Sequence, residues 1–200
     1  MLLRLSLTSP FARKVRLAAA VTGVPLDLEL ADPMNPDDSM RQQNPLGKLP
    51  ILILDDGEIL YDSRVICAWL DHLAGGGKLI PTDPKARFRV LRQEALADGL
   101  TEAGVLVLYE SRFRAPEHHE PKWLAHQEGK IARALKTLED DLPPPDGPVT
   151  LDKIALTCAL GFYDFRFEGK WRDGRERLVA WNDAFAAHCP AYAETTPRLA

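Results

Sequence analysis

The sequence predicts a small α/β unit over residues 1–77, followed by an all-helical unit over residues 84–200. Before residue 77, apolar residues alternate with polar ones in several short runs, which is the spacing of half-buried strands. After residue 84, apolar residues recur at helical spacing. Three glycines at 75–77 and a Pro-Thr-Asp-Pro segment at 81–84 indicate a linker between the two units.

The first three elements are predicted to form a β-α-β arrangement. Leucine alternates with polar residues over 3–7, as in a strand. Ser9 is a good N-cap and Pro10 suits the first helical position, so a helix should begin there and end at Gly23. Leucine alternates again over 26–30, and a right-handed crossover would place this second strand parallel to the first.

The rest of the α/β unit is predicted to contain an irregular link, a hairpin and a helix. Residues 32–44 are polar and include two prolines, so we expect no regular element there. Residues 51–54 and 58–61 flank an Asp-Asp-Gly turn, as in a β-hairpin. A helix should follow Asp62 and end at the glycine run. Its apolar face would consist of Ile66, Trp69, Leu70 and Leu73.

Four helices are predicted in the second unit. They span residues 84 to about 111, about 120 to 142, 151 to about 166, and 175 to 188. Asp83 and Thr150 are suitable N-caps for the first and third of these helices. On the last helix, the inward face would carry Leu178, Trp181 and Phe185.

The composition excludes several classes of partner. With 25 basic and 29 acidic residues the formal net charge is −4, and no Lys/Arg stripe could neutralise a run of phosphates, so no nucleic-acid partner is expected. No run approaches the roughly 20 apolar residues of a membrane span, so no membrane partner is expected either. Cys67, Cys158 and Cys189 stand far apart, which favours free buried thiols and a cytoplasmic location.

The first candidate site is the run 8–11 (Thr-Ser-Pro-Phe), where a predicted strand meets a helix. Unpaired backbone N–H groups and the helix dipole favour an anion at such a junction, and Ser9 would place its hydroxyl there. Arg13, Lys14 and Arg16 in the first turns are expected to deepen the positive potential around it. The alternative is that Ser9 serves only as an N-cap.

The second candidate is the run 44–50 (Asn-Pro-Leu-Gly-Lys-Leu-Pro), which leads into a strand. Pro50 suits the first position of a strand because proline cannot donate to the ladder. If the Leu49–Pro50 bond were cis, Leu49 would turn its N–H and C=O outward, ready to pair with an extended peptide. An ordinary proline turn is the alternative.

The third candidate is the pair Asp62 and Ser63 at a helix start. The two residues could simply cap the helix. Alternatively, the exposed N–H groups and the Ser63 hydroxyl would hold a carboxylate while Asp62 held an ammonium, which suits an α-amino acid. The three candidates in this order suit a short peptide with a free α-amino acid end and a thiol, such as glutathione.

At these residues the sequence resembles the soluble glutathione transferases, and in particular their bacterial branch. The resemblance is carried by the runs 8–11 and 13–15, by 44–50, and by Leu-Tyr-Asp-Ser at 60–63, in that order. It extends to the helical unit through residues 94–99 and 154–156. It implies a thioredoxin-like N-terminal domain before a helical C-terminal domain, a homodimer, and glutathione as co-substrate.

The resemblance also implies roles for individual residues. Ser9 would hydrogen-bond the glutathione sulfur, and the Leu49 backbone would pair with the cysteinyl unit beside a cis Pro50. Asp62 with Ser63 would hold the γ-glutamyl end.

Other residues are also candidates for binding the substrates. Phe11 belongs to the first motif, and Lys48 is a candidate for the glycyl carboxylate, with a solvated lysine as its alternative. Asp98 would reach the γ-glutamyl ammonium across a dimer interface, or else provide buried polarity in its helix. Helical spacing predicts an electrophile site lined by Glu102, Val105, Tyr109 and Arg112.

The leading functional hypothesis is a glutathione S-transferase whose bound thiolate attacks a small, partly apolar electrophile. One alternative is glutathione-dependent reduction of disulfides or peroxides, and another is a non-catalytic binding protein that kept the fold. Cysteine is absent at position 9, which disfavours chemistry through a protein thiol. The histidines at 118, 119 and 126 lack a second ligand pair at zinc spacing, so no metal is expected.

Overall fold

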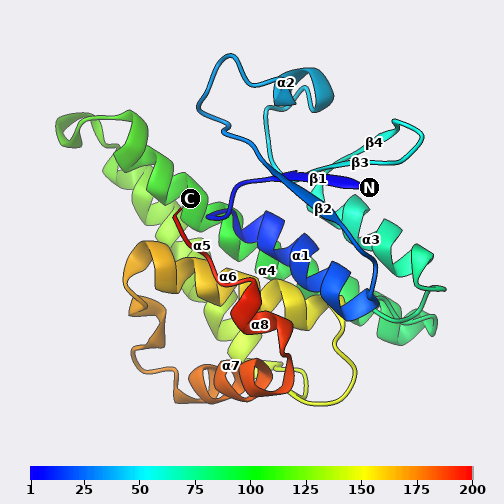
Figure 1. Cartoon of the computed structure of the whole chain (residues 1–200). Helices are drawn as coiled ribbons and strands as arrows, with labels where there is room; N and C mark the ends of the chain where they lie inside the picture. Colours follow the sequence, from blue (N-terminus) through cyan, green and yellow to red (C-terminus); the bar gives the residue numbers. More distant parts are fainter. Residues whose placement is uncertain (200) are drawn as a thin grey trace.

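The computed structural model describes residues 1–199, and its first part is a four-stranded sheet with helices packed on it (Figure 1). The elements are β1 (Leu2–Leu5), α1 (Pro10–Thr22), β2 (Asp27–Leu30), α2 (Met40–Gln43), β3 (Ile51–Ile53), β4 (Ile59–Leu60) and α3 (Ser63–Leu73). The strand order is β2-β1-β3-β4. β2 runs parallel to β1 as predicted, while β3 is antiparallel to both β1 and β4.

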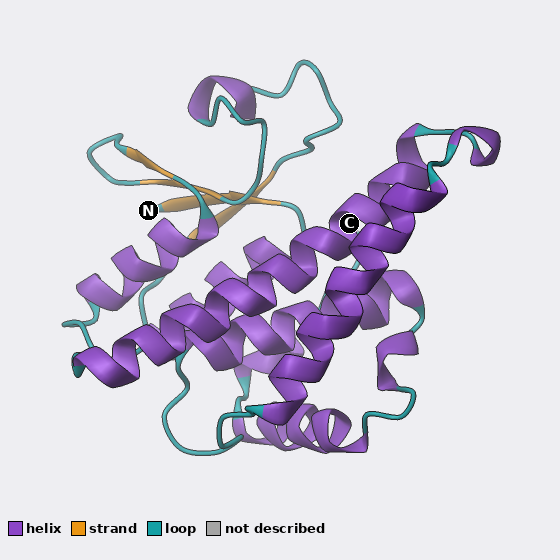
Figure 2. Cartoon of the chain, turned by 180° about the vertical axis from the view of Figure 1, so that it is seen from behind, coloured by secondary structure: helices purple, strands orange, loops and turns teal. Residues whose placement is uncertain are grey.

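The second part is helical (Figure 2). Its elements are α4 (Pro84–Phe113), the 3-10 turn η1 (Pro116–His118), α5 (Pro121–Asp140), α6 (Leu151–Phe167), the 3-10 turn η2 (Lys170–Arg172), α7 (Glu176–His188) and α8 (Ala191–Glu194). α1 packs against α3 of its own unit and against α6 of the helical unit, so it joins the two parts (Figure 1).

Several predicted helix ends are confirmed by their caps. The Ser9 hydroxyl accepts a hydrogen bond from the Ala12 N–H at 3.2 Å, and the Asp62 carboxylate accepts one from the Arg64 N–H at 3.0 Å. α1 ends at Gly23, whose φ of 78° lies in the left-handed region that glycine enters without a Cβ clash.

Other expectations were wrong. The segment 32–44 contains the short helix α2, and α8 was not anticipated. Leu73 is 44% exposed and does not face the core, because it lies in the last turn of α3, where the chain turns away. The Thr150 hydroxyl does not accept a backbone N–H of α6, and its proton is donated to the Asp152 carboxylate.

The segment between the two parts is tied down at both ends. The carboxylate of Asp71, in α3, accepts hydrogen bonds from the Gly77 N–H at 3.1 Å and from the Leu79 N–H at 2.6 Å. Leu79 is fully buried, and its carbonyl accepts the N–H of Leu151 at the start of α6. The predicted linker therefore contributes a buried side chain to the core and is bonded to both parts of the molecule.

α4 and α6 approach each other closely at Gly104. A Cβ placed at this position would lie 2.6 Å from the Tyr163 hydroxyl and 2.9 Å from a ring carbon of Phe162. The Tyr163 hydroxyl can therefore reach the Leu100 carbonyl, to which it donates a hydrogen bond of 2.8 Å.

Over residues 1–199, no helix is both long enough and apolar enough to cross a membrane.

Candidate functional site

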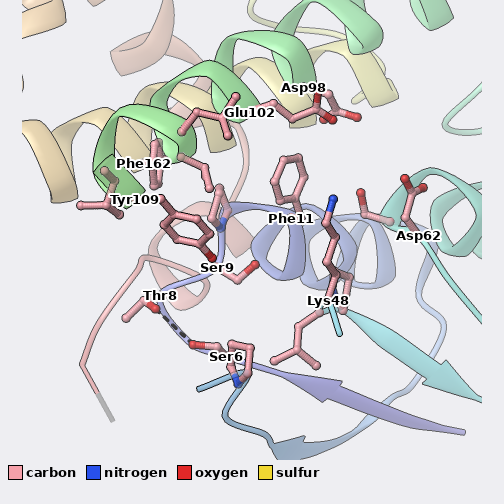
Figure 3. Close-up of a pocket in the computed structure, with 18 of the residues that line it drawn as sticks. Ser6, Thr8, Ser9, Phe11, Lys48, Asp62, Asp98, Glu102, Tyr109 and Phe162 are labelled. Atoms are coloured by element: carbon pink, nitrogen blue, oxygen red, sulfur yellow. Dashed lines mark hydrogen bonds between the residues drawn. The ribbon is translucent and has the colours of Figure 1, made fainter. Parts of the chain in front are cut away.

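One cavity of about 430 Å³ lies between the two parts of the molecule (Figure 3). Its walls come from the N-terminus of α1, the run 44–50, the start of α3, and the facing sides of α4 and α6. All ten predicted catalytic and substrate-binding residues line it: Ser9, Phe11, Lys48, Leu49, Pro50, Asp62, Ser63, Asp98, Glu102 and Tyr109. The three motifs, separated in sequence, thus meet at one place.

Ser9 lies at the centre of the cavity wall, at the N-terminus of α1 (Figure 3). Its oxygen accepts the Ala12 N–H, which leaves the hydroxyl proton available for a ligand. The free N–H groups of the first turn add a positive potential at the same point. The geometry suits stabilisation of an anion such as a thiolate.

Of the three basic residues expected to deepen this potential, Lys14 is neutralised within the protein. Lys14 is 1% exposed, and its ammonium donates to Glu94 at 3.0 Å and to Asp98 at 2.7 Å. Burial acts to lower the pKa of Lys14, but the two carboxylates outweigh it and leave the pKa raised. Arg13 is also buried, with its guanidinium 4.7 Å from the ring centre of Tyr192. The ion pairs of Lys14 therefore offset its charge, while the helix backbone still contributes a positive potential at Ser9.

The run 44–50 presents the Leu49 backbone to the cavity. The Leu49–Pro50 bond is cis, as the second candidate site required. The buried side chain of Asn44 holds the loop, because its amide donates to the Lys48 carbonyl at 2.9 Å and its oxygen accepts the Leu46 N–H at 3.0 Å. Within residues 1–199, neither the N–H nor the C=O of Leu49 has a hydrogen-bond partner, so both can pair with a ligand.

The opposite side of the cavity carries the acidic residues. Asp62 is exposed at the start of α3, and Ser63 beside it is buried. Asp98 is 3% exposed and accepts from Arg64 Nε at 2.8 Å as well as from Lys14. The structure thus places Asp98 in buried helix polarity, and its action across a dimer stays a prediction.

The side of the cavity where the sequence predicted an electrophile is built by α4 and α6. Glu102, Val105, Tyr109 and Arg112 line the cavity, as their helical spacing predicted. Sequence reasoning missed the residues that complete this side, which are Leu106, Leu108, Phe162 and Arg166. Phe162 and Arg166 stand four apart on α6, so they share a face, but the sequence does not show that this face meets α4.

The three cysteines do not take part in the site. All are free and buried, as predicted. Burial raises the pKa of Cys67 and of Cys189, and raises that of Cys158 to about 12. None of the three lines the cavity, and none would supply a thiolate at neutral pH. The described residues also contain no group of three or more His, Cys, Asp or Glu side chains able to hold a metal ion.

The protein has a thioredoxin-like unit followed by a helical unit, and the two share one cavity around a helix capped by a serine. This combination defines the class of protein. Comparison with known families agrees with this class. The family model described as the glutathione S-transferase N-terminal domain matches residues 5–78, and the C-terminal domain model matches residues 121–184. The chain belongs to the glutathione S-transferase family.

The similarity to individual relatives extends over most of the chain. Over 166 residues it is 36% identical to the uncharacterized GST-like protein YibF of Escherichia coli K12, covering 80% of this chain and 81% of YibF. A glutathione transferase family member from Pseudomonas fluorescens Pf-5, solved with bound glutathione, is 40% identical with a TM-score of 0.91 over 99% of both chains. A family member from the same organism was solved with bound S-(propanoic acid)-glutathione, with 39% identity and a TM-score of 0.88 over 100% of both chains. A glutathione S-transferase from Methylobacillus flagellatus KT, solved with glutathione, is 36% identical with a TM-score of 0.91 over 98% of this chain and 99% of that chain.

Proposed function

We propose that this protein binds glutathione and transfers the glutathionyl group, bonded through its sulfur, to a small electrophile. The observation that carries the proposal is the meeting of Ser9, the unpaired Leu49 backbone and the Asp62–Ser63 pair around one cavity. These groups match a thiolate, an extended peptide backbone and an α-amino acid end. Structures of relatives that hold glutathione add support.

Each part of glutathione has a partner in this proposal. The Ser9 hydroxyl donates to the sulfur, and the Leu49 N–H and C=O pair with the cysteinyl backbone. Asp62 and Ser63 hold the γ-glutamyl end, and the exposed Lys48 holds the glycyl carboxylate. Phe11 and the rings of α4 and α6 cover the sulfur from the electrophile side.

The energetics are adequate for thiolate activation. Lowering the pKa of a thiol from about 8.5 by about two units requires about 2.7 kcal/mol of preferential stabilisation of the thiolate. A hydrogen bond to a charged group contributes about 1.5–3 kcal/mol, and a helix N-terminus contributes about 0.3–2 kcal/mol. The Ser9 hydroxyl and the α1 N-terminus can therefore supply the shift together. Ser9 acts as a donor, because an alcohol is a far weaker acid than the thiol.

Conjugation is favoured over reduction through the protein because its cysteines are buried away from the cavity. In a conjugation, a carbon–sulfur bond forms at the electrophilic carbon, the leaving group departs with its electron pair, and the thiol proton passes to solvent. Proximity of the two reactants inside the cavity supplies much of the rate enhancement.

The two parts of the chain have separate roles. Residues 1–77 form the glutathione-binding domain, and residues 84–200 form the domain that binds the electrophile and contributes dimer contacts. The protein is proposed to be cytoplasmic and homodimeric. The dimer is supported by exposed apolar side chains on α3 and α4, namely Val65, Leu73 and Phe88. Sedimentation of the wild type against Phe88→Asp tests the dimer: a monomeric mass for the wild type would contradict the dimer, and equal dimeric masses would exclude Phe88 from its interface.

The decisive test is the Ser9→Ala variant. We expect it to bind glutathione nearly as well as the wild type but to raise the pKa of the bound thiol by about one to two units, because one hydrogen bond to the thiolate is lost. Ultraviolet titration of bound thiolate measures this pKa. Ser111→Ala, which removes an exposed hydroxyl on α4, is the matched control. An unchanged thiol pKa in Ser9→Ala contradicts the role of Ser9.

A panel of substrates separates the alternatives. Activity with an aryl halide supports conjugation, whereas activity only with a mixed disulfide would favour glutathione-dependent reduction. A protein that binds no glutathione even at millimolar concentration would be a non-catalytic member of the family.

A further inference from the structure

The electrophile side of the cavity contains two guanidinium groups that have no acidic partner. Arg112 comes from α4 and Arg166 from α6, and both line the cavity. Among residues 1–199, no carboxylate forms an ion pair with either side chain. Arg64, at the other end of the same cavity, reaches both Asp98 and Glu102.

Arg166 is the less solvated of the two arginines. Its Nε is buried and has no hydrogen-bond partner within the described chain, and its guanidinium lies 4.6 Å from the ring centre of Phe165. Arg112 lines the same cavity; burial lowers the pKa of Arg166, and the charge of Arg112 lowers it further. A buried donor without an acceptor is destabilising, and so is an unpaired cation beside a second one. An anion bound between the two arginines would relieve both effects.

The acidic residues of the cavity cannot supply this anion, because they lie at the other end and have partners there. Figure 3 shows Asp62, Asp98 and Glu102 on one side of Ser9, and Tyr109 and Phe162 on the other. Asp62 caps α3, while Asp98 and Glu102 bind Arg64. Arg112 and Arg166 are therefore separated from the acidic residues of the cavity and lie beside aromatic and aliphatic walls.

We propose that Arg112 and Arg166 bind a carboxylate carried by the electrophile, so that the substrates are apolar or aromatic electrophiles with one anionic group. The proposal rests on the proposed function and specifies the substrate class of the same site. A carboxylate fits because two planar guanidinium groups can each donate paired N–H bonds to its oxygens. The apolar walls formed by Val105, Leu106 and Phe162 would enclose the carbon skeleton between this anion and the sulfur.

The reaction leaves the carboxylate unchanged. With 4-chloro-3-nitrobenzoate as the probe, the glutathione sulfur bonds to the ring carbon that carries chlorine. The carbon–chlorine bond breaks, chloride leaves with the electron pair, and the thiol proton passes to the buffer. Replacing the carboxylate by a carboxamide gives a neutral probe of nearly the same size.

The test compares binding of the two conjugates, S-(4-carboxy-2-nitrophenyl)glutathione and its carboxamide, by isothermal titration calorimetry. We expect the wild type to prefer the carboxylate by about tenfold or more, the effect of a charge-assisted hydrogen bond on affinity. The preference should fall in Arg166→Gln and in Arg112→Gln, and approach unity in the double variant. Arg177→Gln, which removes an exposed arginine on α7, should keep the preference.

The outcomes separate this proposal from the one it rests on. Equal affinity of the wild type for both conjugates overturns the carboxylate site even if a variant fails to fold, while binding of glutathione itself keeps the proposed function. A loss of glutathione affinity in the arginine variants equal to the loss for the carboxylate conjugate also overturns it, because the pair would then hold the glycyl carboxylate. Failure of the wild type to bind glutathione overturns both proposals.

Discussion

Charged side chains differ between two neighbouring regions, the contact between α1 and α4 and the cavity beside it. They are paired with one another in the contact, but not throughout the cavity. In the contact, Lys14, Glu94 and Asp98 are almost completely buried, and the ammonium lies within 3.0 Å of both carboxylates. In the cavity, Arg112 and Arg166 lie together without an acidic partner among residues 1–199. Charges that the chain neutralises itself join its two parts, whereas charges left unneutralised beside a cavity indicate where a ligand binds.

Replacing Lys14 should give the largest change in the free energy of unfolding. Lys14→Met leaves Glu94 and Asp98 buried without their cation, so the free energy of unfolding should fall by about 3–5 kcal/mol at neutral pH. Urea denaturation measures the loss. Lys136→Met, which breaks an exposed pair with Asp140, should cost only about 0.3–0.5 kcal/mol. Equal losses in the two variants would show that the buried cluster is no more important than a surface pair.

The stability of the Lys14→Met variant should also depend on pH. Burial raises the pKa of Glu94 and the charge of Lys14 opposes this, so removing Lys14 raises the pKa of Glu94 further. The folded variant then binds protons more readily than the unfolded chain, and its stability falls as pH rises from the unfolded pKa of about 4.3 through the raised folded pKa. The deficit of Lys14→Met relative to the wild type should therefore shrink in acid. A deficit that grows in acid would contradict this account.

The close approach of α4 and α6 gives the next largest effect. Gly104→Ala would place a Cβ against Tyr163 and Phe162, two rings held in the core, so it should destabilise the fold by about 1–3 kcal/mol. Thermal unfolding measures this loss. Because Phe162 lines the cavity, electrophile binding should weaken as well.

Gly99→Ala, on the same helix, is the matched change with the opposite sign. Nothing lies within 4 Å of a Cβ at this position, so the variant gains helix propensity without a clash. We expect a stabilisation of about 0.5–1 kcal/mol. A loss of stability here would mean that Gly104 is no special contact and that α4 tolerates no added methyl group.

Arg64 gives the smallest expected effect. It shares Asp98 with Lys14, but 44% of its side chain is exposed, so solvent can replace it. Arg64→Met should reduce the free energy of unfolding by about 0.2–1 kcal/mol, in the range of exposed ion pairs. If Arg64→Met lost as much stability as Lys14→Met, the solvent exposure of Arg64 would not determine how much its ion pair with Asp98 contributes.

The elements and the motifs could be predicted because their signals are local. Ser9 and Asp62 cap helices through hydrogen bonds to residues two or three positions away, so sequence alone places them. Leu73 fits the helical period of its neighbours but not the core, because the period says nothing about where neighbouring elements end. Thr150 has the right residue type for a cap, but its hydroxyl accepts no backbone N–H of α6 and instead binds Asp152.

The sequence by itself determined the order of the strands and of the longer helices and the three motifs that meet at the cavity, because capping, periodicity and turn chemistry act over a few residues. The tertiary structure alone decided which charges are paired. Lys14 and Glu94 are 80 positions apart, and no local pattern shows that a lysine in the first turns of α1 will be buried between acidic residues of α4. The two arginines came together in the same way, because Arg112 and Arg166 share the cavity only once α4 packs on α6.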